Sequence, residues 1–253
     1  MRTTTAERGT FGRRARAYAV HLYTASGAAL AFWAAAETCG AEPELRRVFA
    51  LLIAAVVVDA SDGPLARAWQ VKRWAPTVDG RIIDDIVDYL TYTFVPLLLV
   101  WRMGWVPAPA AVWIVPPLVA SLFGFANAAA KDEAGGFFLG FPSYWNVAAF
   151  YAGVLHRFWG PWPNAVMLLA LAALTVAPVR FLYPNLAPRP WKLPLILGAI
   201  AWTAVLVALL LLDYPRSPGW LALVSLVYPA FYTVLSACLA RRTSRAAAPD
   251  GHR

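Results

Sequence analysis

Charged residues are scarce in this chain, and cysteine is almost absent. Only 14% of its 253 residues are charged and 60% are hydrophobic, whereas soluble domains average about 25% charged residues. The deficit excludes an ordinary soluble domain and indicates a membrane protein, with one membrane domain over residues 1–240 and a disordered cytoplasmic tail over 241–253. The two cysteines, Cys39 and Cys238, belong to no metal-binding or redox pattern, so we expect them to pack between helices.

Long polar stretches are also missing. A bilayer core about 30 Å thick requires about 20 apolar residues per helix, and several segments of the chain approach that length. We therefore predict an all-α integral membrane protein, a bundle of about eight transmembrane helices preceded by a short N-terminal interfacial helix. The predicted segments are 18–37, 47–70, 79–101, 107–129, 143–159, 163–183, 193–212 and 218–240.

The basic residues predict the orientation. The net charge is +8, but the Lys and Arg side chains stand at the ends of apolar segments, which argues against a nucleic-acid partner. Most of them fall in the N-terminal tail, in alternate loops and at the C-terminus, so we expect both termini in the cytoplasm. Arg13, Arg14 and Arg16 either lie along the anionic membrane surface in the interfacial helix or belong to an unstructured basic tail.

Acidic side chains inside two apolar segments are the main anomaly. Asp59 and Asp62 lie in the second segment, and Asp84 and Asp88 in the third. Each would cost roughly 2.5–3.5 kcal/mol within a transmembrane helix, which amounts to on the order of 10 kcal/mol for all four. A bound group must offset this cost.

Helical geometry gathers these carboxylates with small residues. At 100° per residue they share an arc of about 140° on the second segment and about 80° on the third. A short loop joins the two segments, so the helices pack antiparallel and their acidic faces can meet. The faces contain Asp59, Asp62, Gly63, Ala66 and Arg67, then Gly80, Asp84 and Asp88. The four aspartates would form a cage of hard oxygen ligands that suits Mn²⁺ or Mg²⁺, with two ions expected, while Asp85 points away.

The neighbours of the carboxylates suit a phosphate ligand. Gly63 and Ala66 leave room for a ligand to approach the helix backbone. Pro64 removes a backbone donor and opens the helix at this point. Arg67, one turn closer to the cytoplasm, can bind a phosphate bidentately.

These residues resemble the signature of the CDP-alcohol phosphotransferases, D-x-x-D-G-x-x-A-R followed by G-x-x-x-D-x-x-x-D. Every position of the signature is filled. The spacer between its halves, residues 68–79, is longer than usual and resembles that of the bacterial phosphatidylcholine synthase branch. The resemblance extends to VDYLTYTFVP at 87–96, GFPSYWN at 140–146 and PVRFLYPN at 178–185, and so covers most of the chain.

The resemblance implies a reaction and a set of roles. The chain would be a metal-dependent transferase that moves the phosphatidyl group of CDP-diacylglycerol to choline, giving phosphatidylcholine and CMP. Asp59, Asp62, Asp84 and Asp88 would hold the metal pair, and Asp88 would also be the general base for the acceptor hydroxyl. The CDP group would contact Gly63, Ala66, Arg67 and Gly80.

Aromatic side chains are candidates for the acceptor site, because aromatic faces commonly hold quaternary ammonium groups such as choline. The candidates are Tyr89, Tyr92, Tyr144, Trp145 and Asn146, with Glu133 as a further possibility. An interfacial aromatic belt is the alternative interpretation. His21 and His156 are expected to be packing or interface residues.

Other interpretations remain open. Serine, inositol or glycerol phosphate could be the acceptor, with Arg180 and Arg189 as distant phosphate-binding candidates. The aspartates could instead form helix-end salt bridges, or they could be the site of a divalent-cation transporter. Transporters commonly have repeated halves, yet Asp213 is the only acidic residue between 160 and 240. The salt-bridge partners would be Arg67, Lys72, Arg73 and Arg81.

The expected setting is the bacterial inner (cytoplasmic) membrane, crossed several times, with the active site on the cytoplasmic side. The expected partners are CDP-diacylglycerol, choline and membrane lipid, with no nucleic acid. The oligomeric state is open, and a homodimer is one alternative.

Overall fold

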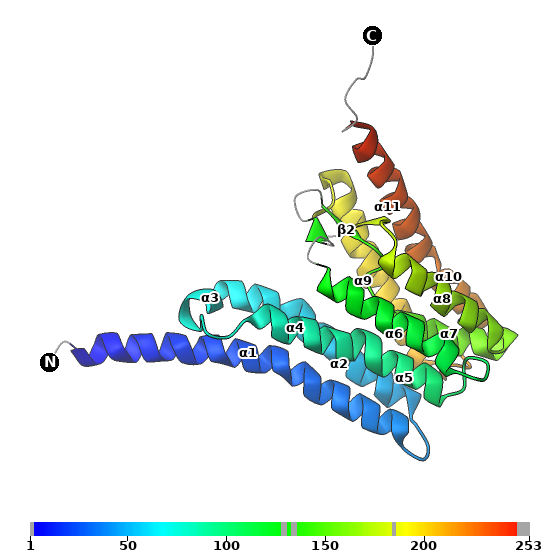
Figure 1. Cartoon of the computed structure of the whole chain (residues 1–253), viewed down its shortest axis with the longest axis horizontal. Helices are drawn as coiled ribbons and strands as arrows, with labels where there is room; N and C mark the ends of the chain where they lie inside the picture. The colour runs from blue at the N-terminus through cyan, green and yellow to red at the C-terminus, as the bar shows by residue number, and fades with distance from the viewer. Residues whose placement is uncertain (1–2, 128–130, 133–135, 184–185, 247–253) are drawn as a thin grey trace, which may run out of the picture. The chain divides into compact units, whose positions relative to one another are not determined.

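Helices dominate the computed structural model, which describes residues 3–127, 131–132, 136–183 and 186–246. The chain divides into two compact units. The first comprises Met1–Met103 and Trp145–Ala149, and the second comprises Gly104–Tyr144 and Phe150–Arg253. In Figure 1 the helices from blue to blue-green belong to the first unit.

The first unit is organised around its N-terminal helix. Helix α1 (Thr3–Cys39) packs chiefly against α2 (Leu45–Ala68), and the short α3 (Val71–Trp74) follows. The chain then returns along α1 as one helical stretch with three parts, visible beside α1 and α2 in Figure 1. These parts are α4 (Gly80–Asp88), the π-helix η1 (Tyr89–Phe94) and α5 (Val95–Arg102).

A close contact and an apolar cluster hold α1 against these helices. A Cβ built on Gly27 would overlap Cγ1 of Val87, so α1 and α4 approach closely because Gly27 has no side chain. Closer to the N-terminus of α1, Ala17 and Val20 are buried together with Val71 and Ala75. Both helices of the motif, α2 and α4, therefore pack against α1.

The predicted short interfacial helix is wrong as a separate element. A single helix runs from Thr3 to Cys39, without a break before residue 18. The reason lies in the sequence, because this stretch is rich in alanine and contains no proline. Arg13, Arg14 and Arg16 thus belong to the same helix as the first apolar segment.

The second unit contains the remaining helices and a small sheet. Helix α6 (Ala111–Ala126) packs against α8 (Trp162–Val176), while α9 (Arg189–Leu211) packs against α10 (Gly219–Ser225) and α11 (Val227–Ala246). Helix α7 (Trp145–Trp159) begins in the first unit and continues in the second.

Three short strands correct the all-α prediction. They are β1 (Lys131–Asp132), β2 (Phe137–Leu139) and β3 (Arg180–Leu182), in the antiparallel order β1-β2-β3. Phe138 pairs with Phe181, and their rings stack with centroids 5.8 Å apart. Aromatic side chains favour such pairs across strands, so β2 and β3 join as a sheet next to α11. The predicted helical segment 163–183 is therefore too long, because α8 ends at Val176 and Arg180–Leu182 form β3.

Buried polar side chains join elements within the second unit. Asn164 Nδ2, on α8, donates to the carbonyl oxygens of Trp105 and Ala152 at 2.8 and 2.9 Å. Tyr214 Oη donates to the carbonyl of Phe150 at 2.8 Å, and burial raises the pKa of Tyr214. Such bonds replace the water that these groups would otherwise need.

Four helices in the described part of the chain are long and apolar enough to cross a bilayer. They are Thr10–Cys39, Leu45–Ala68, Arg189–Leu211 and Gly219–Arg242, and Ala111–Ala126 and Trp162–Val176 are shorter apolar helices. The structure is therefore that of a helical membrane protein. Helix α11 continues to Ala246, so residues 241–246 of the predicted tail are helical. The rest of the predicted tail lies outside the described residues.

Candidate metal and active site

Three aspartates meet in the first unit. Asp59 on α2 and Asp84 and Asp88 on α4 each offer a carboxylate oxygen, and these oxygens all lie within 4.8 Å of one another. Each side chain is partly buried. Three carboxylates this close repel one another unless a cation or protons neutralise them. The group thus has the charge and ligand chemistry of a site for a hard divalent cation.

A hydrogen bond joins the two sides of this cluster. Tyr92 Oη, on η1, donates to Asp59 Oδ2 at 2.7 Å. Tyr92 lies four residues after Asp88, in a π-helical stretch, and π-helical turns occur frequently at functional sites. The wider turn places the phenol of Tyr92 beside the carboxylate of α2. Tyr92 is buried, so the bond orients Asp59 as an outer partner orients a metal ligand.

One oxygen of Asp88 gives the strongest indication of a bound cation. Its Oδ1 is buried and accepts no hydrogen bond from any residue that the structure describes. An unpaired buried carboxylate oxygen is costly, so its natural partner is a group that binds from outside the chain. The residues present therefore fit a divalent cation.

Two neighbouring aspartates do not join this group. Asp62, one turn after Asp59, is buried and lies outside the set of three whose oxygens converge. Asp85 is also outside it. Asp79 caps α4 instead, since its Oδ1 accepts from the backbone N–H of Arg81 at 3.0 Å.

The predicted nucleotide contacts lie on the same helices. On α2, Arg67 Nη1 lies 3.5 Å from the Cβ position of Gly63, so the guanidinium folds back along the face that contains the aspartates. At the start of α4, a Cβ on Gly80 would lie 3.0 Å from Cε1 of His21. Pro64 stands inside α2, as the sequence indicates. Ala66 packs next to the apolar cluster of α1 and α3.

The arginines and lysine of the salt-bridge alternative do not pair with the motif. Arg81 contacts Asp79, with Nη2 3.7 Å from Oδ2. Arg67, Lys72 and Arg73 form no ion pair with an aspartate in the described part of the chain. Helix-end salt bridges from these four residues therefore do not account for the acidic cluster.

The candidate choline residues have different surroundings. Tyr92 is engaged through its hydroxyl with Asp59, and Trp145 is fully buried at the start of α7. Asn146 Oδ1 accepts from the backbone N–H of Val147 at 2.8 Å. Tyr144 is 45% exposed and Tyr89 is partly buried. Glu133 lies outside the described residues.

Two features of the site have no clear signal in the sequence. His21 is buried against Gly80, and its Nε2 has no hydrogen-bond partner among the described residues. Gly27 is one small residue among many in an alanine-rich helix, yet it sets the approach of α1 to the residue before Asp88. Both contacts join positions that are far apart in the chain, so no local pattern reveals them.

The fold and the site together define a class, that of helical membrane proteins with a carboxylate cluster able to hold a divalent cation. No family model matches the chain. It is, however, 40% identical to the phosphatidylcholine synthase of Pseudomonas aeruginosa over 176 residues, which are 68% of this chain and 70% of that protein. It is 36% identical to that of Bradyrhizobium diazoefficiens, over 81% of this chain and 75% of the relative.

A third relative covers more of the chain. The phosphatidylcholine synthase of Rhizobium johnstonii is 33% identical over 229 residues, which are 88% of this chain and 90% of that protein. This chain belongs to the phosphatidylcholine synthase family. It is therefore an enzyme of phospholipid synthesis, as the motif indicates.

Proposed function

We propose that this chain transfers the phosphatidyl group of CDP-diacylglycerol to choline, releasing CMP. One observation carries the proposal: in a chain that belongs to the phosphatidylcholine synthase family, Asp59, Asp84 and Asp88 converge, and a buried oxygen of Asp88 has no hydrogen-bond partner among the described residues. The wider kinship with CDP-alcohol phosphotransferases rests on the motif residues 59–88 alone.

The proposed cofactor is Mn²⁺ or Mg²⁺, as a pair of ions. Asp59, Asp84 and Asp88 would bind them, with Asp62 as the fourth ligand on the next turn of α2. When bound, the ions would neutralise the pyrophosphate of the donor and the charge that develops on the leaving CMP. Tyr92 would keep Asp59 oriented through the bond to its Oδ2.

The donor would lie along the glycine-containing face of α2 and α4. Arg67 presents its guanidinium next to Gly63, where it could bind a donor phosphate bidentately. Gly63 would leave space for the nucleotide against the backbone of α2, and Ala66 and Gly80 are the further proposed contacts. At Gly80 a side chain would also press on His21.

Asp88 is the proposed general base. The choline hydroxyl oxygen would attack the phosphorus of the phosphatidyl group, and the bond from that phosphorus to the CMP oxygen would break. The hydroxyl proton would pass to the Asp88 carboxylate, which lies at the cation cluster. One P–O bond forms and one breaks, so the products are phosphatidylcholine, CMP and a protonated carboxyl group.

The acceptor site remains a proposal. Tyr89, Tyr92, Tyr144, Trp145 and Asn146 are its candidates, with aromatic faces to hold the quaternary ammonium. The full burial of Trp145 and the hydroxyl bond of Tyr92 restrict the surfaces that these two could offer. Tyr89, partly buried and adjacent to Asp88, keeps more of its ring accessible.

The proposed topology has eight spans in the bacterial inner membrane, within a catalytic domain over 1–240. The segments beyond the four long helices would be the shorter α6, α7 and α8 and the stretch from α4 to α5. The distribution of Lys and Arg supports cytoplasmic termini and a cytoplasmic active site. A homodimer is proposed as the simplest assembly.

An acceptor panel tests the reaction. Membranes that contain the full chain, CDP-diacylglycerol and Mn²⁺ would receive choline, serine, inositol or glycerol 3-phosphate in turn, with lipid product and CMP as readouts. Product from choline alone is expected. Product from another acceptor instead would replace choline in the proposal, and divalent-cation uptake without any CMP release would favour a transporter.

Adjacent aspartates provide a matched test of the site. Asp84→Asn removes a carboxylate of the converging group, whereas Asp85→Asn removes the same charge from the next residue, outside that group. We expect turnover to fall at least about 100-fold in the first variant and to stay within about twofold in the second.

Asp88→Asn should bind metal yet show almost no turnover; near-normal turnover would reject Asp88 as the base.

A further inference from the structure

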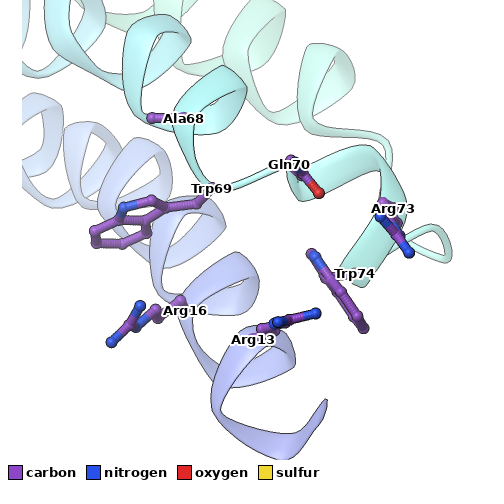
Figure 2. Close-up of a pocket in the computed structure, with 7 residues that line it drawn as sticks. All are labelled: Arg13, Arg16, Ala68, Trp69, Gln70, Arg73 and Trp74. Carbon is purple, nitrogen blue, oxygen red and sulfur yellow. The ribbon is translucent and has the colours of Figure 1, made fainter. Parts of the chain in front are cut away.

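A pocket lined by arginine and tryptophan lies next to the end of α2, outside the motif. Its volume is about 350 Å³, and Figure 2 shows its side chains. Helix α1 contributes Arg13 and Arg16, and the chain after α2 contributes Trp69, Gln70, Arg73 and Trp74. No acidic residue is among those that line it.

The spacer between the two halves of the motif builds this pocket. Residues 68–79 contain α3, and Gln70 adopts a left-handed backbone (φ 50°) that turns the chain from α2 into α3. Val71 and Ala75 are buried against Ala17 and Val20 of α1. The long spacer therefore folds back on α1 and holds the basic residues of both segments around one space.

The charges in the pocket are gathered without a negative partner. The guanidinium carbons of Arg13 and Arg73 lie 5.1 and 5.0 Å from the ring centroid of Trp74, as Figure 2 illustrates. A cation–π contact with a ring uses no N–H acceptor, so the five N–H donors of each guanidinium can still bind an anion. Arg13, Arg16 and Arg73 form no ion pair with any residue from 10 onward whose side chain the structure describes. An anion with several oxygens would satisfy them.

The position of the pocket indicates where that anion comes from. The candidate span Thr10–Cys39 has 30 residues, or about 45 Å of helix, which exceeds a bilayer core of about 30 Å. The excess places Arg13 and Arg16 at the level of the lipid headgroups when Cys39 is at the opposite surface. Trp69, the residue after the span Leu45–Ala68, is typical of that level. A lipid phosphate is the anion present there.

We propose that this pocket binds the phosphate of a phospholipid with a net negative charge, at a site separate from the aspartates. Three guanidinium groups favour such a headgroup over a zwitterionic one, whose ammonium group they repel. Binding would tie the N-terminal part of α1 to α3 at the membrane surface. The proposal does not depend on which alcohol the enzyme uses.

Two double variants with equal charge loss test the site. Arg13→Gln/Arg73→Gln removes one pocket charge from α1 and one from α3. Arg14→Gln/Lys72→Gln removes one charge from each of the same helices, at positions that do not line the pocket. The full chain in non-ionic detergent would be titrated with short-chain phosphatidylglycerol, and bound lipid counted by native mass spectrometry. We expect affinity to fall about tenfold or more in the pocket variant and by less than about twofold in the control.

Other measurements separate the alternatives. Equal loss in both variants would mean general charge attraction, and equal binding of short-chain phosphatidylcholine would mean no selectivity for negative headgroups; either would overturn the proposal. Displacement by low millimolar inorganic phosphate would assign the pocket to a soluble anion and reject the lipid. A raised KM for CDP-diacylglycerol in the pocket variant, in bilayers without other anionic lipid, would make the pocket part of the substrate site and likewise reject it.

Loss of the contacts to Trp74 could unfold the double variant, so a single variant provides a second test. Arg16→Gln leaves both cation–π contacts in place. We expect it to weaken phosphatidylglycerol binding several-fold more than its matched control Arg14→Gln. Thermal unfolding would first show that both variants are folded. Equal affinity of the two for phosphatidylglycerol would then contradict the proposed site.

Discussion

Gly27→Ala probes how the N-terminal helix positions the converging aspartates. The added methyl group would overlap Cγ1 of Val87, the residue before Asp88. Carbon atoms prefer contacts of about 3.5–4.0 Å, so the overlap is on the order of 1 Å and α1 and α4 must separate to relieve it. Val87 is buried, so it has no solvent-exposed space into which it can turn.

The expected losses follow from this displacement. Overpacking of this kind costs about 1–3 kcal/mol of folding free energy, partly offset by about 1 kcal/mol because alanine favours a helix over glycine. A displacement of 1 Å in a catalytic group can reduce turnover about 100-fold. We expect turnover, measured as CMP release in membranes, to fall about 10- to 100-fold with a modest decrease in Tm.

Two further variants test whether the contact between Gly27 and Val87 causes the expected loss of turnover. Gly12→Ala adds the same methyl group to the same helix at a position with no atom within 4 Å, and it should leave turnover unchanged. Val87→Ala removes the overlapping methyl group, so Gly27→Ala/Val87→Ala should recover turnover relative to Gly27→Ala. Wild-type turnover in Gly27→Ala, or no recovery in the double variant, would refute the packing argument.

Three other expectations concern metal, orientation and stability. Dialysis against EDTA should abolish CMP release, and Mn²⁺ or Mg²⁺ should restore it; full turnover after complete metal removal would contradict the carboxylate site. Tyr92→Phe removes the donor to Asp59 Oδ2 and should raise the metal concentration for half-maximal turnover about 10- to 100-fold. If Tyr92→Phe is normal and only Tyr92→Leu is impaired, the ring rather than the hydroxyl matters. Asn164→Ala leaves the carbonyls of Trp105 and Ala152 without their donor, which should cost about 1–3 kcal/mol per group and appear as a lower Tm.

The membrane class and the enzyme family were both predictable from the sequence. Apolar length predicts the long helices because a bilayer imposes a minimum span, and α1, α2, α9 and the helices from Gly219 meet it. The spacing of Asp84 and Asp88 predicts one face of a helix because the helical period is local. The relatives confirm the predicted phosphatidylcholine synthase branch. The roles of the individual site residues stay predictions.

Some elements depend on partners that the sequence does not show. The strands β2 and β3 form because Phe138 and Phe181 meet across a sheet, although more than forty residues separate them in the chain. The residue composition of η1 likewise does not predict a π-helix. This element is stabilised where Tyr92 donates a hydrogen bond to Asp59 on another helix. Local propensity cannot predict either feature, since their stability comes from distant contacts.

The sequence by itself therefore determined the membrane setting, the long apolar helices and the chemistry of the acidic motif, because hydrophobicity, helical period and carboxylate chemistry act over a few residues. Tertiary structure alone decided which carboxylates converge, namely Asp59 with Asp84 and Asp88 while Asp62 stays outside their group. It also decided that α1 carries both the Gly27 contact beneath the aspartates and the arginines of the pocket at α3. These arrangements depend on how closely whole helices approach, and that approach is set by side-chain volumes at positions far apart in the chain.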